Sequence, residues 1–316
     1  MRLYQQFRTA IKLTESNRLD KEDADAVWFD SFLERLRDGK NTDDDWMRMR
    51  DLGSRDTLRY EQWRQRGFAN DDVVHLYTTN KEVSKRNLYC LQQKKKPIVR
   101  INSVNTGKGK QATPNQAGGL VSSLFLCEGA KIILTKNVAQ QVGLCNGSTG
   151  TIAAFVYEND KPPPNLPQYV IVDFGDSYKG KPLFGDDTDK AGWVQIFPET
   201  HEWQSQNSTN LNEMAKHSRS MLPIRLCYAW TIWKAQGQTL KCKIVVNLGK
   251  TEKEHGLTYT VLSRVTKASD IGIVGGFPKD RLIDKVAKQA KMKTRITEEK
   301  RLNVIVKCTI RELTYM

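Results

Sequence analysis

The segment from Leu222 to Thr266 decides the fold of this chain. It reads LPIRLCYAWTIWKAQGQTL (222–240), KIVVNLGK (243–250) and GLTYTVLSRVT (256–266). Its first part is apolar from Ile224 to Trp233 and then gives way to a Lys-Ala-Gln-Gly-Gln-Thr cluster, which can turn and form hydrogen bonds. We therefore expect an apolar element that presents polar groups at the edge of a sheet.

Short runs after this element complete an alternating pattern. Residues 243–248 are rich in β-branched side chains and predict a buried strand of a parallel sheet, lying beside another strand. Residues 259–265 favour a helix, and residues 271–274 predict one more short strand. Strands that alternate with helices are typical of an open α/β sheet, which binds its ligands at the carboxyl ends of its strands.

Three positions in this segment are expected at that edge, namely Gln236, Gly237 and Arg264. A glycine lets backbone N–H groups approach a phosphate closely, and an arginine on a rigid element can supply charge to a phosphoryl group in transfer. For Arg264 taken alone, a surface ion pair is the simpler interpretation.

Motifs in a particular order point to a known family. The sequences AWTIWKAQGQTL (229–240) and GLTYTVLSRV (256–265) resemble motifs V and VI of Pif-type (petite integration frequency) DNA helicases, which are superfamily 1B enzymes. Upstream, EGAKIILTKN (128–137) and LCNGSTGTI (144–152) resemble segments of that family's second domain, and LTESNR (13–18) is similar to its motif IV. Trp233 is a departure, because the family commonly carries His there, so no role of that His is transferred.

The resemblance extends over residues 1–276 and implies an α/β fold. The expected architecture is the second RecA-like domain of a helicase, of the P-loop NTPase type, with an inserted small β-barrel and a helical N-terminal segment. The expected order is a helical segment (1–70), the first part of the second RecA-like domain (71–150), a small β module (151–220), the part with motifs V and VI (221–278) and a basic tail (279–316).

The resemblance also implies roles for single residues. Arg264 would be the arginine finger on the γ-phosphate of ATP, and Arg18 would be a second cationic contact. Gln236 and Gly237 would couple the nucleotide to the DNA strand. Weaker candidates for nucleic-acid contacts are Thr231 and Lys234. ATP and Mg²⁺ are the cofactors expected of the full-length family member, and single-stranded DNA is its expected partner.

A strand, turn and helix are expected over residues 73–91. The run 73–79 is strand-like, and 82–91 can form a helix. In the resembling family a Thr-Asn pair here opens the second RecA-like domain, so Thr79 and Asn80 would touch the nucleic-acid backbone or the nucleotide. An equally good interpretation is that Asn80 caps the helix.

The N-terminal part predicts helices with no chemistry of their own. Apolar residues form a packing stripe that ends at Asp38-Gly39, and they are Val27, Phe29, Phe32, Leu33 and Leu36. Asp43, Asp44 and Asp45 are interpreted as an acidic start to a helix, which complements its dipole, and not as a metal site.

Short β runs and a basic loop lie in the middle of the chain. Trp193, Phe197 and Trp203 are expected in the core of the small β module, in preference to base stacking. Residues 107–119 predict a mobile basic loop near Lys94–Lys96, which either contacts phosphates non-specifically or is solvated surface. No aromatic residues interleave there, so no base-stacking platform is expected.

Composition sets wider bounds. The 316 residues suffice for two domains, and 50 Lys and Arg against 36 Asp and Glu give a net charge of +14, which favours a polyanionic partner. The six cysteines form no Cys-x-x-Cys pair, so reduced thiols are expected in place of a zinc site. The sequence contains no apolar run of about 18 residues, so it predicts no membrane span. A nuclear or mitochondrial location fits, with no secretory signal.

The tail from Lys279 carries eleven basic and five acidic residues. Leu282, Val286 and Ala290 suggest one amphipathic helix there.

A complete motor also needs a P-loop, and the sequence has none. Leu248-Gly249-Lys250-Thr251 resembles half of a Walker A motif, but the first glycine would fall at position 244, which is Ile. We expect the ATP-binding first domain to be absent from the chain and supplied by a longer product or a separate chain. The main hypothesis is the C-terminal half of a 5′–3′ DNA helicase of repair, recombination or telomere maintenance, inactive alone. The alternatives are a non-catalytic nucleic-acid-binding remnant and an RNA-binding remnant.

Overall fold

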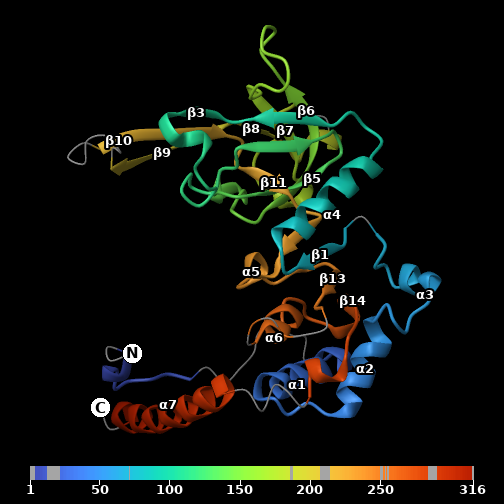
Figure 1. Ribbon diagram of the computed structural model, residues 1–316, viewed down its shortest axis with the longest axis vertical. Helices are drawn as coiled ribbons and strands as arrows, with labels where there is room; N and C mark the ends of the chain where they lie inside the picture. The colour runs from blue at the N-terminus through green and yellow to red at the C-terminus, as the bar shows by residue number, and fades with distance from the viewer. Residues whose placement is uncertain are drawn as a thin grey trace. The chain divides into compact units, whose positions relative to one another are not determined.

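The computed structural model describes residues 4–12, 22–70, 72–185, 188–206, 214–249, 252, 254, 256–283 and 290–314 (Figure 1). The chain divides into two compact units. The first unit joins Met1–Asn80 to Trp230–Met316, and the second unit is Lys81–Ala229. Each unit has its own sheets and its own buried cluster of apolar side chains.

A four-stranded sheet forms the centre of the first unit, in the order β12-β1-β13-β14. Its strands are Val74–Tyr77 (β1), Ala229–Thr231 (β12), Ile244–Asn247 (β13) and Ile271–Val274 (β14). β13 pairs in parallel with β1 and β14, which puts Ile244 beside Val74 and Ile271. The first three residues of β13 are buried, so its continuous β-branched run fits a strand covered on both faces. The expected parallel pairing is confirmed.

Helices make up most of the rest of the first unit. They are Ala24–Asp38 (α1), Asp43–Gly53 (α2), Tyr60–Gln65 (α3), Ile232–Ala235 (α5), Leu257–Leu262 (α6) and Ala290–Thr314 (α7). α1 ends where the sequence predicts, because Gly39 adopts a left-handed conformation with φ 68° and its N–H bonds to Arg35 and Leu36 carbonyls. None of the helices in the described ranges is both long and apolar enough to cross a membrane.

The apolar stripe of α1 differs from the expected one at a single position. Four of the five expected residues are buried, namely Phe29, Phe32, Leu33 and Leu36, whereas Val27 is 48% exposed. Ala26 is fully buried instead, since it lies three residues before Phe29 and therefore on the same face.

α2 has the expected acidic start, and it also begins with a capping box that was not predicted. The Thr42 hydroxyl accepts the N–H of Asp45, and the Asp45 carboxylate accepts the N–H of Thr42. Arg35 donates two further hydrogen bonds to Asp45, of 2.8 and 2.5 Å. Burial would raise the pKa of Asp45, but the bonds from Arg35, Thr42 and Asn41 hold that pKa below its ordinary value. Asp45 is therefore a structural carboxylate.

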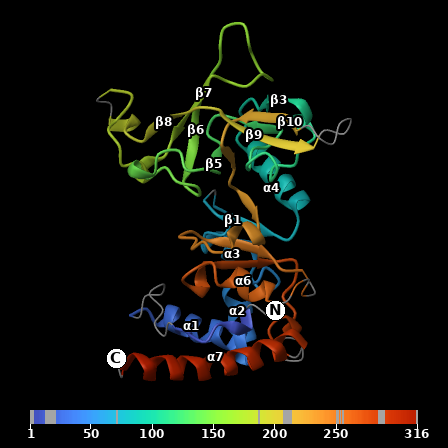
Figure 2. The same cartoon turned by 90° about the vertical axis from the view of Figure 1, so that its left-hand side faces the viewer.

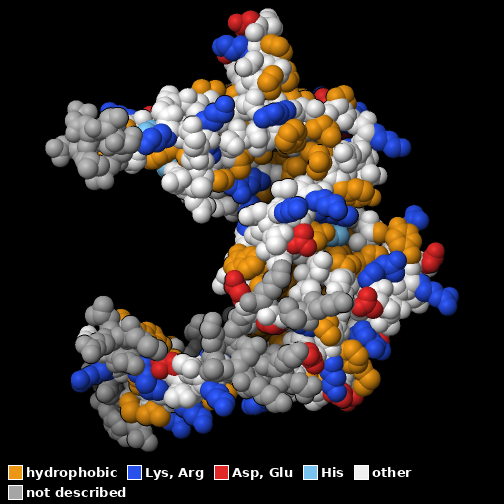
Figure 3. All heavy atoms as spheres, viewed as in Figure 1, with side chains coloured by type: hydrophobic (Ala, Val, Ile, Leu, Met, Phe, Trp, Pro, Cys, Tyr) orange, Lys and Arg blue, Asp and Glu red, His pale blue; other side chains and the backbone are white. Residues whose placement is uncertain are grey.

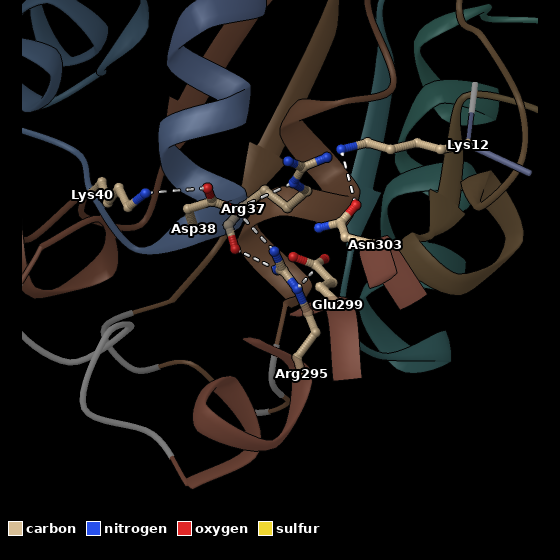
Figure 4. Close-up of polar contacts among 7 residues, drawn as sticks. All are labelled: Lys12, Arg37, Asp38, Lys40, Arg295, Glu299 and Asn303. Carbon is tan, nitrogen blue, oxygen red and sulfur yellow. Dashed lines mark hydrogen bonds and ion pairs between the residues drawn. The ribbon is translucent and has the colours of Figure 1, made fainter. Parts of the chain in front are cut away.

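α7 runs past α1 within the first unit (Figures 1 and 2). Figure 4 shows Arg295 of α7 reaching Asp38 at the end of α1, at 2.9 Å, and Lys12 reaching Asn303, at 3.5 Å. The helix starts later than the sequence predicts, because Leu282 is buried behind the short 3-10 turn Lys279–Arg281 and Ala290 is its first residue. Val286 lies outside the described residues.

The second unit consists of one helix and antiparallel sheets. The helix is Asn80–Gln93 (α4), and the strands are Val99–Asn102 (β2), Val104–Thr106 (β3), Ser123–Leu126 (β4), Lys131–Leu134 (β5), Thr149–Val156 (β6), Tyr169–Asp173 (β7), Trp193–Ile196 (β8), Glu199–Gln206 (β9), Met214–Met221 (β10) and Ile224–Leu226 (β11). The strand orders are β11-β5-β6-β7-β8, β3-β10-β9 and β2-β4.

This unit begins earlier than the expected module 151–220. Leu91 of α4 and Ile101 of β2 share one buried core with Val170 and Ile196, so residues 81–150 pack with the β sheets. The five-stranded sheet has an open order, with β11 and β8 at its two edges. We therefore describe antiparallel sheets where the sequence predicted a small barrel.

The aromatic residues expected in this core are not its main members. Phe197 is 52% exposed, and Trp193 and Trp203 are half-buried. Val194 and Ile196 point inward in their place, because they alternate with Trp193 and Phe197 along the strand. The prediction therefore placed Trp193 and Phe197 on the wrong face of the strand.

The basic loop 107–119 is held by an arginine from β10. Arg219 is fully buried, and its guanidinium donates to the backbone carbonyls of Leu120 (2.8 Å), Ala112 (2.7 Å) and Gly109. The side-chain carbonyl of Asn105 accepts from its Nε at 3.1 Å. The expectation of a mobile loop is therefore wrong, since two of these bonds hold Gly109 and Ala112 within the loop and the other two hold Asn105 and Leu120 beside it.

Candidate nucleotide and nucleic-acid site

The predicted edge exists in the first unit. β1, β13 and β14 are parallel, so their carboxyl ends meet at one edge of the sheet. The backbone turns sharply behind β13, where the side chain of Asn247 accepts the N–H of Gly249 at 3.1 Å. Gly275, behind β14, lies so close that an added Cβ would be 2.4 Å from the Asn247 side-chain oxygen. The turns at this edge are thus closely packed.

Thr79 and Asn80 follow β1 at this edge. Both are exposed. α4 begins at Asn80 itself, so Thr79 directly precedes the helix. The pair is accessible to a ligand. This exposure is compatible both with a contact to nucleic acid or nucleotide and with Asn80 as a helix cap.

α5 presents Thr231 and Lys234 beside β12. The Thr231 hydroxyl accepts the N–H of Lys234 at 3.4 Å and so caps the helix, while Ile232 and Ala235 are buried. The ammonium group of Lys234 lies 5.9 Å from the ring of Trp230. Trp233, the position that departs from the resembling family, is 42% exposed.

Gln236 and Gly237 form the turn behind α5, and both are exposed. Gln236 leaves the helical conformation, with φ −62° and ψ 134°, and Gly237 has φ 82°, which favours glycine. No heavy atom lies within 4 Å of a Cβ built at Gly237. This part of the backbone is open to close approach by a ligand.

Arg264 joins the two motifs. It is half-buried, and its Nη1 group donates to the carbonyls of Ala235 (3.4 Å) and Gln238 (3.2 Å), on either side of the Gln236-Gly237 turn. Its Nε donates to the Thr260 carbonyl at 2.7 Å, and the Arg264 carbonyl accepts the N–H of Leu240 at 2.8 Å. The structure thus brings together Arg264, Gln236 and Gly237, which the sequence placed at one edge.

A second buried arginine near this edge was not singled out from the sequence. Arg281 is 1% exposed, donates to the Leu248 carbonyl at 2.7 Å and lies 3.4 Å from the carboxylate of Glu252. Glu252 also accepts from Thr258 of α6, at 3.0 and 2.7 Å. Burial lowers the pKa of Arg281, and Glu252 opposes that change. Only its place in a basic tail marked Arg281, which is no specific signal.

Two expected features cannot be placed. Arg18 and the rest of the segment LTESNR lie outside the described residues, as do Lys250 and Thr251. In the part of the chain that the structure describes, no group of three His, Cys, Asp or Glu side chains could hold a metal ion. The six cysteines are all free thiols.

Comparisons with known proteins point to one family. Residues 115–155 match the family model for the 2B domain of the DNA helicase Pif1. The ATP-dependent DNA helicase PIF7 of Trypanosoma brucei brucei is 28% identical over 176 residues, which are 52% of this chain and 17% of that protein.

Solved structures agree with this match in their fold. The Pif1 helicase of Candida albicans gives a TM-score of 0.59 with 24% identity, over 88% of this chain and 58% of that chain. Bacteroides Pif1 bound to ssDNA gives a TM-score of 0.54 with 20% identity, over 93% of this chain and 56% of that chain. The chain thus spans a little over half of these structures and 17% of the curated relative. With motifs V and VI joined by the bonds of Arg264 and a 2B-domain match in the second unit, the chain is similar to Pif-type DNA helicases in sequence and in fold.

Proposed function

We propose that this chain is the second RecA-like half of an ATP-dependent DNA helicase that moves 5′ to 3′ along single-stranded DNA. ATP would bind between this half and a first RecA-like domain, which carries the P-loop and is supplied by a longer product or a separate chain. Closing of the two domains on ATP would alternate which of them grips the strand. DNA repair, recombination or telomere maintenance, in the nucleus or mitochondrion, are the processes that the family suggests.

The observation that carries the proposal is the contact of Arg264 with the Gln236-Gly237 turn. Its bonds to Ala235 and Gln238 are long, at 3.4 and 3.2 Å. Arg264 would exchange them for a phosphate oxygen, and the turn would then be free to move. An arginine finger would in this way report the state of the nucleotide to the residues that touch DNA.

The residues of this chain fit part of the nucleotide. Arg264 offers a cation, and the open backbone at Gly237 offers close approach to an anion. The described residues do not fit Mg²⁺, because no three His, Cys, Asp or Glu side chains among them lie close enough together to hold a metal ion. The metal would therefore be held by the first domain. When bound, it would neutralise charge on the phosphates.

The DNA strand would lie across the turn behind β12 and the turn behind β1. Thr231 and Lys234 would contact its phosphates from α5, and Thr79 and Asn80 would contact them from the start of α4. That a Bacteroides relative was crystallised with ssDNA supports this choice of partner.

Binding to single-stranded DNA tests the proposal, measured by fluorescence anisotropy as a function of salt, together with ATP hydrolysis. The purified chain should bind DNA with an affinity that falls steeply with salt and should not hydrolyse ATP. The Lys234→Ala variant should bind more weakly, by about threefold to tenfold. Thr231→Ser is the matched control, since it keeps the hydroxyl that caps α5. DNA-stimulated ATP hydrolysis by the chain alone would contradict the proposal. DNA binding by a chain that no P-loop domain can activate would favour a non-catalytic remnant.

A further inference from the structure

The outer face of α4 carries basic and aromatic side chains together. Lys81, Lys85 and Tyr89 recur at intervals of four residues, so they lie along one side of the helix, and all three are exposed. Leu91 faces the other way, into the core. Figure 3 shows basic and hydrophobic side chains next to one another over the region where α4 lies in Figure 1. We call Lys81, Lys85, Arg86, Leu88 and Tyr89 the α4 face.

The ring of Tyr89 is presented to solvent with a cation beside it. Tyr89 is 50% exposed, and the guanidinium of Arg86 lies 5.3 Å from its ring centroid. Leu88 beside it is 44% exposed. A planar ring held in this way offers a stacking surface, and the guanidinium offers a charge to a neighbouring anion.

The charge of this segment is strongly one-sided. Residues 81–100 contain seven basic side chains and one acidic, a net charge of +6. The segment 55–74 has the same length and four side chains of each sign. A surface of this charge attracts a polyanion. The exposed apolar side chains of the α4 face are only Leu88 and Tyr89, which is a smaller apolar patch than protein interfaces usually have.

A second pair of the same kind follows in the second unit. Arg100 on β2 lies opposite Phe125 on β4, with its guanidinium 6.0 Å from the ring centroid, and Phe125 is 46% exposed. No aromatic residue interleaves with Lys94–Lys96 in the sequence, because Tyr89 precedes these lysines in a helix and Phe125 lies beside the following strand only through β-sheet pairing.

We propose that the α4 face is a second binding surface for single-stranded nucleic acid, made of residues other than those assigned at the sheet edge of the first unit. Lys81 and Lys85 bind phosphates, and one base stacks on Tyr89. The distance along the helix from Lys81 to Tyr89 is about 12 Å, the length of about three stacked nucleotides. A polyanion with planar rings is the ligand that both the charge and the exposed tyrosine fit. The proposal does not rest on the roles assigned at the sheet edge, because none of those residues belongs to the α4 face.

Two strands of about 15 nucleotides test the proposal, an oligothymidine and an abasic strand of equal length. Tyr89→Ala should weaken binding of the oligothymidine by about 5- to 100-fold and leave binding of the abasic strand unchanged. Lys85→Ala should weaken binding of both and reduce the slope of log affinity against log salt by about 0.7.

Tyr60 supplies a matched control. It is 55% exposed and has the guanidinium of Arg55 at 5.6 Å from its ring, but it lies in the segment of zero net charge. Tyr60→Ala should change neither affinity. Circular dichroism should find both tyrosine variants folded, because neither ring is in the core.

The same titrations in a Thr231→Ala/Lys234→Ala background separate the two surfaces. Oligothymidine binding that remains there should be lost on adding Tyr89→Ala. Equal effects of Tyr89→Ala and Tyr60→Ala, or equal losses on the thymidine and abasic strands, would overturn the proposal and leave the sheet-edge site untouched. If Thr231→Ala/Lys234→Ala alone has no effect while Tyr89→Ala does, the sheet-edge site is wrong and the α4 face stands.

Discussion

Two loops of this molecule are each held by one arginine that donates to backbone carbonyls, and they differ in burial. Arg219 is fully buried and holds the loop 107–119 of the second unit. Arg264 is half-buried and holds the turn 235–238 of the first unit. A buried guanidinium has no water to replace a lost partner, whereas a half-buried one does. The same side chain is therefore a fixed support in one unit and an exchangeable contact in the other.

Removing Arg219 should produce the largest effect. Arg219→Ala leaves the carbonyls of Gly109, Ala112 and Leu120 without this donor in the interior, and we expect the second unit to lose about 3–5 kcal/mol of unfolding free energy. Urea denaturation and amide hydrogen exchange in residues 107–120 measure it. Arg219→Lys keeps the charge but not the fork and should recover only part of the loss. If Arg219→Ala lowered the unfolding free energy by less than about 1 kcal/mol, Arg219 would not be a stronger support than Arg264.

Low pH should distinguish Arg35, which is paired with the Asp45 carboxylate, from Arg219 and Arg264, which bond to backbone carbonyls. The pKa of Asp45 is lower in the folded protein than its ordinary value, so its contribution is complete at neutral pH and is lost as the pH falls below about 4. At pH 7, Asp45→Asn should lower the unfolding free energy by about 1.5–3 kcal/mol. The difference between wild type and variant should shrink in acid. The corresponding differences for Arg219→Ala and Arg264→Ala should stay constant, because carbonyls do not titrate.

Arg264→Ala should have a smaller effect on stability than either change. We expect about 1–2 kcal/mol, because water can reach the carbonyls of Ala235 and Gln238. Hydrogen exchange at residues 235–240 should become faster, and Arg264→Lys should restore part of the protection. An effect as large as that of Arg219→Ala would mean that Arg264 is a fixed support and would weaken its role as an arginine finger.

Removing the uncharged hydroxyl of Tyr228 should have the smallest effect on the unfolding free energy. The Tyr228 hydroxyl accepts the N–H of Lys131 at 3.0 Å, and burial raises the pKa of Tyr228 to about 12. The folded state favours the protonated form, so this stability is present below about pH 10 and is lost as the pH rises through about 12. Tyr228→Phe should lower the unfolding free energy by about 0.5–1.5 kcal/mol at pH 7. Its alkaline transition should also become shallower in circular dichroism.

The sheet edge of the first unit was predictable because its signals are local. Apolar runs end in turn residues, so Lys243–Leu248 could be recognised as a parallel strand, and Arg264 does contact the turn that contains Gln236 and Gly237. The sequence also predicted the end of α1 at Gly39 and an acidic start of α2, whereas the cap by Thr42 was not predicted. The assigned roles of these edge residues remain predictions.

What the sequence missed depends on partners far away in the chain. Arg219 is more than a hundred residues from Gly109, so nothing near residues 107–119 indicates that the loop is held. The inward choice of Val194 over Trp193 depends on the register of one strand, which shifts every side chain when it changes by one residue. The early start of the second unit, likewise, depends on Leu91 and Ile101 sharing one core with Val170 and Ile196, which lie far along the chain.

The contact between α4 and β12 has a consequence for protein engineering. The side chain of Asn87 donates to the Ala229 carbonyl at 3.4 Å and accepts the Ala229 N–H at 3.0 Å, and β12 lies next to β1 in the sheet. The chain therefore leaves β1 for the second unit and returns from it on a neighbouring strand. Because the chain enters and leaves this insertion on neighbouring strands, we expect that the cassette 81–229 can be removed and Asn80 joined to Trp230 by a Gly-Ser linker that connects the two strands. Such a deletion would yield a minimal α/β scaffold, ready to receive a different insert.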